Sequence, residues 1–456
     1  MVDQITRSRN DLLGWPLVAA LFKNKRVLFI VRTVAALLFI SAIWFGLRYP
    51  ALAENPYTSA VFWSLFWPFF MIVSIVLVGP GFCGVCPHGV LGRFLSKFGT
   101  KKEVPEWMKH RGIGLGILIA AYWVPAYLFP GLLKTPWVAA LLFAGLTLLA
   151  LAVFSRYKNM AYCTYLCPIG SVTKSYGKLG MVRLQTYRDA CDSCTTFDCA
   201  KACETGLQPY LFDKKNSMRD CTLCMDCAQS CEAVSLQLVK PSKGMFGEVN
   251  DRHNIHTYVY ILLLAIITIT MHFHHGLGHS PVKTQTPWYA AGQWLASFLP
   301  AGVDWVGFAA LSMALAATGV LVFGGFAVAA ALVKKPFKSF LHRNSYALAP
   351  MMIIGSLSHV GSFFFIHYAS DLANAWFWLI GSAETMRPLA SMRDGWVHLF
   401  SLFGYVGAIW SAVILYSRLG MYEVSAAKRL AAFVVSGAMI WFYIGLLLLS
   451  MAVRSH

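Results

Sequence analysis

The chain has 456 residues, of which 57% are hydrophobic and 13% are charged, and its formal net charge is +18. A soluble protein of this composition would expose large apolar patches, so the composition excludes an ordinary soluble globule and indicates a polytopic membrane protein. The excess positive charge does not gather on a nucleic-acid-binding motif, and we expect no nucleic-acid partner.

Apolar stretches of about 20 residues, the length that a helix needs to cross a bilayer core of about 30 Å, recur along the chain. The predicted fold class is therefore an all-α polytopic membrane protein of about nine transmembrane helices, with membrane lipid as one partner, and with a small inserted cysteine-rich segment. The predicted spans are residues 27–47, 58–80, 112–133, 137–154, 256–273, 305–333, 346–368, 396–417 and 430–453.

Lys and Arg residues divide unevenly between the two sides that these spans define. The side that holds the amino terminus and the cysteine-rich segment has 31 of the 38. The other side has 6, and Arg32 lies within a span. Without the 13 in the long segment itself, 18 remain against those 6. The positive-inside rule therefore predicts an inner-membrane protein whose amino terminus and cysteine-rich segment are cytoplasmic, where thiols stay reduced.

In chain order, the first chemistry-bearing motifs follow the second and fourth spans. GPGFCGVCPHG places Cys83 and Cys86 at the cytoplasmic membrane boundary, and AYCTYLCPIG places Cys163 and Cys167 there. Two proline-terminated pairs at one depth favour a third redox or metal site, whereas the alternative is that these cysteines are small buried hydrophobes. The unequal spacings, two residues and three, leave open whether the four thiols meet.

Eight further cysteines fall between residues 191 and 231. The second four have the spacing C-x2-C-x2-C-x3-C, in which three sulfurs of one loop bind one cubic cluster and the fourth serves a partner cluster. This pattern predicts a ferredoxin-like segment with two [4Fe-4S] clusters. One is expected on Cys191, Cys194, Cys199 and Cys231, and the other on Cys203, Cys221, Cys224 and Cys227.

Two features depart from the usual ferredoxin pattern. Four residues separate Cys194 from Cys199, and Glu204 and Glu232 stand where proline commonly follows the last cysteine. Zinc on paired C-x2-C groups and disulfides in an oxidising compartment are the competing interpretations. The regular third and fourth cysteines favour clusters over zinc.

These motifs resemble the NosR/NapH family of membrane polyferredoxins over residues 27–240. The resemblance implies electron transfer between the quinone pool and a reductase system, and relatives of the CcoG type imply copper reduction and oxidase assembly. This chain departs from the family in three ways. Its first pair is C-x2-C-P where C-x3-C-P is common, no outer connection is long enough for a flavin-bearing domain such as that of NosR, and about five more spans follow.

Histidines are the chemistry-bearing residues of the last five predicted spans. His359 lies within a span, and His272, His275, His367 and His398 lie near outer ends. Imidazole binds iron, copper and zinc and can hold haem, so haem b or another metal is one interpretation. A quinone pocket is the second, and histidines that only hydrogen-bond to water or lipid headgroups are the third.

The predicted organisation has four parts. They are a cytoplasmic amino-terminal segment (1–26), a four-helix membrane domain (27–184), the two-cluster segment (185–245) and a five-helix histidine-containing membrane domain (256–453). We expect electron transfer between quinol, or an outer redox centre, and the cytoplasmic clusters, with a redox partner protein. The alternative is a copper reductase or cofactor-assembly factor that uses the C-P pairs. No P-loop or dinucleotide-binding loop is evident, so we expect no nucleotide site.

Overall fold

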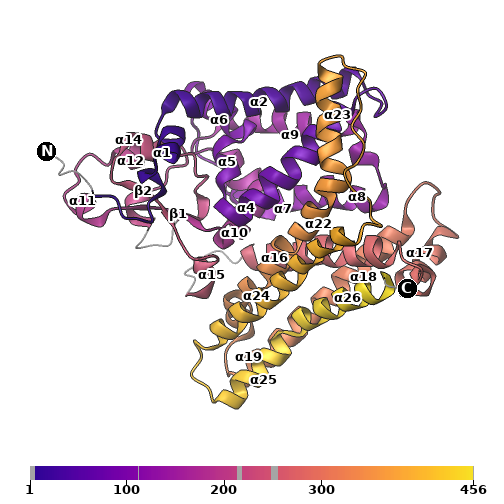
Figure 1. Cartoon of the computed structure of the whole chain (residues 1–456). Helices are drawn as coiled ribbons and strands as arrows, with labels where there is room; N and C mark the ends of the chain where they lie inside the picture. The colour runs from indigo at the N-terminus through magenta and orange to yellow at the C-terminus, as the bar shows by residue number, and fades with distance from the viewer. Residues whose placement is uncertain (1–5, 111, 213–217, 248–254, 455–456) are drawn as a thin grey trace. The chain divides into compact units, whose positions relative to one another are not determined.

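The computed structural model describes residues 6–110, 112–212, 218–247 and 255–454 (Figure 1). The chain divides into two compact units, each of which draws on three stretches of sequence. Unit 1 comprises Met1–Ile117, Lys134–Lys243 and Asp371–Met386. Unit 2 comprises Leu118–Leu133, Gly244–Ser370 and Arg387–His456.

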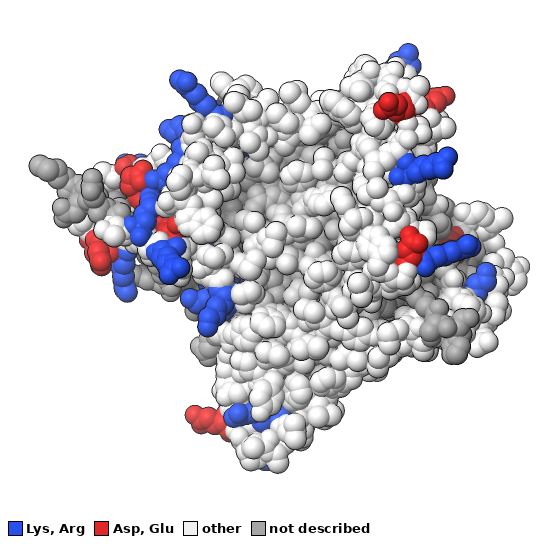
Figure 2. Space-filling model, viewed as in Figure 1, with Lys and Arg blue, Asp and Glu red and all other residues white. Residues whose placement is uncertain are grey.

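Seven helices in the described residues are long and apolar enough to cross a membrane, and a bent pair makes an eighth candidate. The seven are Lys25–Arg48, Pro56–Val78, Pro136–Arg156, Ile255–Leu277, Trp305–Leu332, Phe337–Leu379 and Gly395–Leu419. The bent pair is Ala426–Ser436 and Ala438–Val453, with an angle of 52°. The chain is therefore an all-α multi-pass membrane protein, and the face seen in Figure 2 is largely free of charged side chains.

Two of the nine predicted spans differ from continuous crossing helices. The third is the shorter apolar helix Gly112–Leu128, which at 1.5 Å per residue is about 26 Å long and ends ahead of Pro130. The ninth bends at Gly437, where the helix α25 (Ala426–Ser436) gives way to α26 (Ala438–Arg454). Hydropathy therefore overestimated the length of the third helix, and it gave no sign of the bend in the ninth.

Unit 1 is built on three crossing helices, which are α2 (Lys25–Arg48), the run from α3 (Pro56–Ser59) to α4 (Ser74–Val78), and α9 (Pro136–Arg156). Buried aromatic rings fill the space between them, as in the edge-to-face contacts of Phe39 with Phe62 and Phe66. An outer connection was expected from residue 369, but the chain continues as α23 (Ala369–Leu379). In that helix Asp371 accepts a 2.8 Å hydrogen bond from Ser64.

Two helical hairpins follow the second and third of these crossing helices. The first consists of α5 (Gly81–Val85) and α6 (Pro87–Phe98), and the second of the π-helical turn Tyr162–Leu166 and α10 (Pro168–Tyr176). Each proline stands at the first turn of its second helix, where no backbone donor is lost. The residue before each proline is extended, so the chain reverses there.

The feet of the two hairpins are joined by backbone hydrogen bonds. Thr100, which follows the first hairpin, donates from its N to the carbonyl of Ser155, which precedes the second, at 2.9 Å. Met181, which follows the second hairpin, donates from its N to the carbonyl of Leu77, which precedes the first, at 3.0 Å. The end of each hairpin is thus hydrogen-bonded to the start of the other.

The ferredoxin-like part of unit 1 is a small α-helical layer on a two-stranded sheet. Strands β1 (Val182–Thr186) and β2 (Val234–Leu238) pair antiparallel, with Leu184 opposite Leu236. The short helices between them are α11 (Arg188–Asp192), α12 (Asp198–Lys201) and α14 (Asp226–Ser230).

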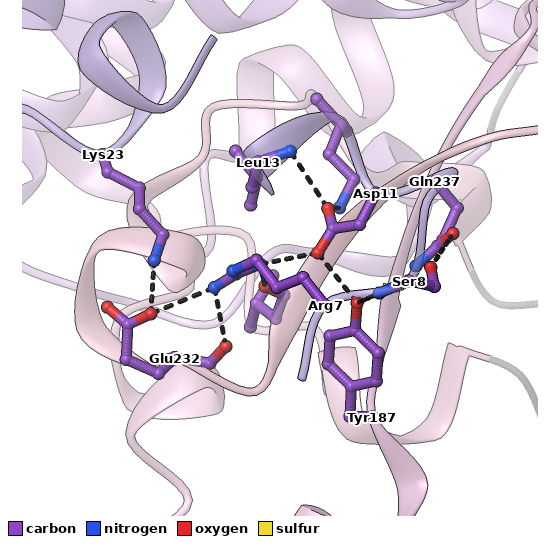
Figure 3. Close-up of polar contacts among 10 residues, drawn as sticks. Arg7, Ser8, Asp11, Leu13, Lys23, Tyr187, Glu232 and Gln237 are labelled. Atoms are coloured by element: carbon purple, nitrogen blue, oxygen red, sulfur yellow. Dashed lines mark hydrogen bonds and ion pairs between the residues drawn. The ribbon is translucent and has the colours of Figure 1, made fainter. Parts of the chain in front are cut away.

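The amino-terminal segment packs on this sheet through Asp11, which is 1% exposed (Figure 3). Its carboxylate accepts hydrogen bonds from Leu13 N and Leu236 N at 3.0 Å, from Arg7 at 2.6 Å and from the Tyr187 hydroxyl at 3.0 Å. Arg7 also bonds the backbone and side-chain oxygens of Glu232. Hydrogen bonds from Lys23 and Arg7 lower the pKa of this exposed glutamate.

Unit 2 contains most of the α-helices not yet described. They are α8 (Val124–Leu128), α16 (Ile255–Leu263), α17 (Pro287–Ala296), α18 (Trp305–Gly319), α19 (Gly325–Leu332), α20 (Phe337–Asn344), α21 (Ala349–Ile353), α22 (Ser356–Phe363), α24 (Leu402–Leu419), α25 and α26. Short helix α15 (Lys243–Phe246) connects the units. Buried Arg418 donates to the carbonyl of Arg343 in the last turn of α20 and to that of Met245 in α15. Backbone carbonyls at two helices thus accept its hydrogen bonds in place of a carboxylate.

We expect Asp11→Ala to destabilise the protein by about 3 kcal/mol, because it leaves Arg7 and two buried backbone donors without their acceptor. Thermal unfolding in detergent measures this change. Asp189→Ala, at an exposed aspartate of the ferredoxin-like part on which this segment packs, is the matched control. Equal effects of the two substitutions would contradict the assignment of Asp11 as the anchor.

Candidate functional site

The structure brings the four C-P thiols, those of Cys83, Cys86, Cys163 and Cys167, together at the hairpin tips. Burial, and then the thiols of Cys167 and Cys83, raise the pKa of Cys86 to about 12. Burial, and then the other three C-P thiols, also raise the pKa of Cys163. Each pair therefore lies within electrostatic reach of the other, which the spacings alone had left open.

The two hairpins hold their cysteines in matching ways. A side chain at Gly89 would meet Cys83 O at 3.2 Å, and one at Gly170 would meet Cys163 O at 3.0 Å. Glycine at the third position after each second cysteine therefore lets the two arms of a hairpin approach. In addition, Gly170 N donates to the Cys167 sulfur at 3.2 Å.

A cation stands seven residues after the second cysteine in both hairpins. Lys174 donates to Cys163 O at 2.9 Å and pairs with Asp220 at 3.4 Å. Its counterpart Arg93 donates to Gly84 O at 3.4 Å. Sequence reasoning missed this pair, although aligning CPHGVLGR with CPIGSVTK reveals it.

The tip of the first C-P hairpin packs against two of the crossing helices. His88, two residues after Cys86, packs edge-on against Phe39 at 5.2 Å and shares a 2.9 Å hydrogen bond with Thr147. At 1.5 Å per residue, Phe39 is about 21 Å along α2 from Lys25, and Thr147 is about 14 Å along α9 from Arg156. The tip of the first hairpin therefore lies among the crossing helices, and His88 also packs edge-on against Tyr162 of the second hairpin.

The first ferredoxin-type set, Cys191, Cys194, Cys199 and Cys231, gathers around α11 and α12. Burial and then the Cys231 thiol raise the pKa of Cys199 to about 11, and Cys231 and Cys194 also raise that of Cys191. Cys199 is buried, whereas Cys194 stands near the surface beside exposed Phe197.

The second set, Cys203, Cys221, Cys224 and Cys227, lines one pocket. Its other walls include Leu184, Leu207, Phe212 and Met225. A pocket with apolar walls and four thiols fits a cubic iron-sulfur cluster, whose potential depends on exposure and on hydrogen bonds to sulfur. The grouping of the eight cysteines in space is the crossed arrangement expected from their spacing, while their role as ligands remains a prediction.

The longer spacer between Cys194 and Cys199 does not change the local geometry at the third cysteine. Phe197 and Met225 each stand two residues before a third cysteine, each has left-handed backbone dihedrals, and each precedes a short helix that begins with aspartate. The two extra residues are therefore accommodated before Phe197. Left-handed backbone at non-glycine residues costs about 1–3 kcal/mol and commonly occurs at binding loops.

The three groups of thiols form a row within unit 1. The Cys199 thiol of the first set contributes, after burial and its own neighbours, to the raised pKa of Cys227 in the second set. The Cys83 thiol of the C-P group contributes in the same way to Cys221 of the second set. The second set therefore stands between the other two.

Arg32 joins the C-P group to the second set. It is the one charged residue predicted inside a span, and its guanidinium donates to Gly84 O at 3.0 Å, to Cys224 O and to the Asp226 carboxylate at 3.2 Å. Gly84 completes the contact, because a side chain there would meet Leu223 O at 2.5 Å. Sequence reasoning noted Arg32 but gave it no partner.

The predicted histidine ligands lie on separate parts of unit 2. His272 shares a 2.8 Å hydrogen bond with Thr268 O, and His359 stacks on Phe363 at 3.8 Å, which in turn lies 5.3 Å from His367. In the described part of the chain, no three His, Cys, Asp or Glu side chains are placed to hold a single metal ion. A haem or metal role for His272, His275, His359, His367 and His398 remains a prediction, which a reduced-minus-oxidised absorption spectrum tests.

We expect Gly84→Ala to destabilise unit 1 by about 1–3 kcal/mol, the usual cost of overpacking, because its methyl group meets backbone rather than a mobile side chain. Gly145→Ala, at a helical glycine with open space around it, should be neutral or slightly stabilising. Thermal unfolding of the two variants in the same detergent measures the difference. A neutral Gly84→Ala would show that the loop contact is loose.

Comparison with known proteins finds a 4Fe-4S match at the stretches that contain the C-P pairs. A family model described as a 4Fe-4S binding domain matches residues 59–105 and 137–185, so that each matched stretch contains one C-P pair and ends before Cys191. No solved structure matches the chain.

Three curated relatives show how far the similarity extends. YccM of Escherichia coli (strain K12), whose name describes electron transport, is 24% identical over 47% of this chain and 66% of its own length. The regulatory protein NosR of Pseudomonas aeruginosa is 25% identical over 42% of this chain and 29% of its own. The uncharacterized protein MJ0749 of Methanocaldococcus jannaschii is 27% identical over 36% of this chain and 68% of its own.

The chain therefore spans less than two thirds of the first two relatives. What it shares with them is limited to about half of its own sequence, and the matched C-P stretches fall in that half's membrane helices and hairpins. The amino-terminal half of the chain is therefore similar to NosR-type membrane 4Fe-4S electron-transport proteins.

Proposed function

We propose that this protein relays single electrons between quinol and a soluble cytoplasmic redox partner through three iron-sulfur centres. Two are the [4Fe-4S] clusters of the first and second sets, and the third is bound by the four C-P thiols. Two packing observations carry the proposal. Cys199, Cys221 and Cys227 pack in one core cluster, and Gly84 of the first C-P hairpin packs on the Leu223 backbone between Cys221 and Cys224.

The residues of each group fit such centres. Iron-sulfur clusters bound by cysteine thiolates supply one-electron transfer, with potentials that depend on charge, hydrogen bonding and exposure. The second set already surrounds a pocket, and the family model of 4Fe-4S binding falls on the C-P pairs. The buried thiols have raised pKa values, so binding iron must displace their protons.

The surroundings of the row suggest what lies at its two ends. The C-P tips lie among crossing helices, which favours quinol, a lipid-soluble donor, at that end. Cys194 and Phe197 of the first set are near the surface, which favours a soluble partner at the other. The uneven distribution of Lys and Arg supports a cytoplasmic location for that end, and hence insertion in the inner membrane.

Two cationic side chains, Arg32 and Lys174, would fix the C-P loops relative to the second set. Arg32 and Lys174 bind the backbone of cysteine-bearing loops, and both pair with aspartates of the second-set segment, Asp226 and Asp220. A fixed cation beside each loop offsets the negative charge of thiolate ligands in a medium of low dielectric. These residues position the centres and carry no electron themselves.

Iron and sulfide analysis of anaerobically purified protein tests the number of centres. We expect about 12 iron atoms per chain, and loss of about 4 when any one set of four cysteines is changed to serine. Electron paramagnetic resonance of the reduced variants should lose a different signal in each case. Zinc in place of iron would overturn the proposal.

The order of the relay is tested with the variant Cys83→Ser, Cys86→Ser, Cys163→Ser, Cys167→Ser. We expect quinol to lose its ability to reduce the first and second sets, while dithionite still reduces both, because the entry point alone is missing. Cys-to-Ser changes in the first set are the matched control and should leave quinol reduction of the second set intact. If quinol still reduces the clusters while a copper enzyme fails to mature, the C-P pairs serve metal delivery instead.

A further inference from the structure

Tyr162 is the buried polar side chain of the C-P group that the relay does not yet use. It begins the π-helical turn that carries Cys163 and leads to Cys167, and it is 1% exposed. Its ring is held edge-on against His88 at 5.6 Å and Phe154 at 5.7 Å. Both cysteines pack against the core cluster that contains this ring. The side chain is therefore fixed in place beside two of the four thiols.

The hydroxyl of Tyr162 is completely buried, and no residue in the described chain accepts or donates a hydrogen bond to it. A buried tyrosine hydroxyl normally has a partner, because leaving the group unsatisfied costs about 1–3 kcal/mol. Cys163 and Cys167 pack against the same core cluster as the Tyr162 ring. The orphaned donor therefore belongs to the packed group that holds the second C-P pair.

We propose that the Tyr162 hydroxyl donates a hydrogen bond to a sulfur of the C-P centre and thereby raises the reduction potential of that centre. The inference rests on the proposed third centre. Adding an electron increases the negative charge on cluster sulfur, and a hydrogen bond to charged sulfur is stronger than one to neutral sulfur. Hydrogen bonds to sulfur are among the factors that set cluster potentials.

The surroundings explain why such a donor is needed. The C-P tips are packed among rings such as Phe39, Phe66 and Phe82, and a low-dielectric environment disfavours added negative charge. The hydroxyl partly offsets this effect at one side of the site. Without it, electrons would enter the C-P centre less readily.

The two hairpins differ at this position, which makes the donor one-sided. Phe82 precedes Cys83 as Tyr162 precedes Cys163. Phe82 contacts Phe66 at 6.0 Å and Phe70 at 5.6 Å and has no hydroxyl. The first hairpin thus shows that a phenyl ring fits at the equivalent place, and Tyr162→Phe is a mild substitution.

The test is an EPR-monitored redox titration of the full chain in detergent. The C-P signal is identified as the one lost in the four-cysteine variant. We expect Tyr162→Phe to retain its iron and to lower the reduction equilibrium constant of this centre about tenfold, which is about 59 mV for one electron. The other two centres should not shift. Tyr443→Phe, at a buried tyrosine of unit 2, is the matched control and should shift none of them.

A second measurement applies to the unmodified protein. Pulsed EPR after exchange into D2O should detect a deuteron from the Tyr162 hydroxyl coupled to the C-P centre, besides that of the Gly170 N–H, which donates to Cys167 sulfur. Tyr162→Phe should remove only the former. If Tyr162→Phe loses iron, this measurement on the parent protein decides: no coupled deuteron beyond that of Gly170 overturns the hydrogen bond. An unchanged potential with retained iron also overturns it. Unmodified protein with iron for two centres only would instead overturn the third centre of the proposed function.

Discussion

The arrangement of unit 1 depends on backbone hydrogen bonds exchanged between the ends of the two C-P hairpins. Ser155 and Leu77 supply the acceptor carbonyls, and Thr100 and Met181 the donors. Backbone that enters a membrane outside a helix must find every partner within the protein, because lipid offers none. Exchanging partners at the feet meets this demand for both hairpins at once. It also brings two cysteine pairs, 80 residues apart in sequence, to a common place.

Two cationic side chains connect the C-P loops to the second set in addition to the backbone hydrogen bonds. Arg32 and Lys174 each donate to carbonyls of a cysteine-bearing loop and each pair with an aspartate near the second set. A charged side chain inside a membrane helix is costly unless it is paired, so its presence usually has a functional reason. Here the reason is the union of the C-P loops with the ferredoxin-like segment. The relay we propose requires that union, since electrons pass only between neighbouring centres.

The matching features of the hairpins show an internal repeat, with differences that matter. Both have cysteine, cysteine and proline, then glycine, then a cation at the same position, and both match the same 4Fe-4S model. Tyr162 occupies the position equivalent to Phe82, and His88 the position equivalent to Ile169. The repeat forms a symmetric set of ligands, whereas the differing residues place one hydroxyl and one imidazole near the site.

The sequence by itself determined the all-α membrane class, the grouping of the eight ferredoxin-type cysteines and the resemblance to membrane polyferredoxins. Hydropathy and cysteine spacing are local patterns, and they are set by bilayer thickness and by the size of a cluster. Tertiary structure alone decided the meeting of the C-P pairs, the partners of Arg32 and the place of α23 in unit 1. These depend on contacts between residues distant in the chain, such as His88 with Thr147 and Gly84 with Leu223, for which no single stretch of sequence carries a signal.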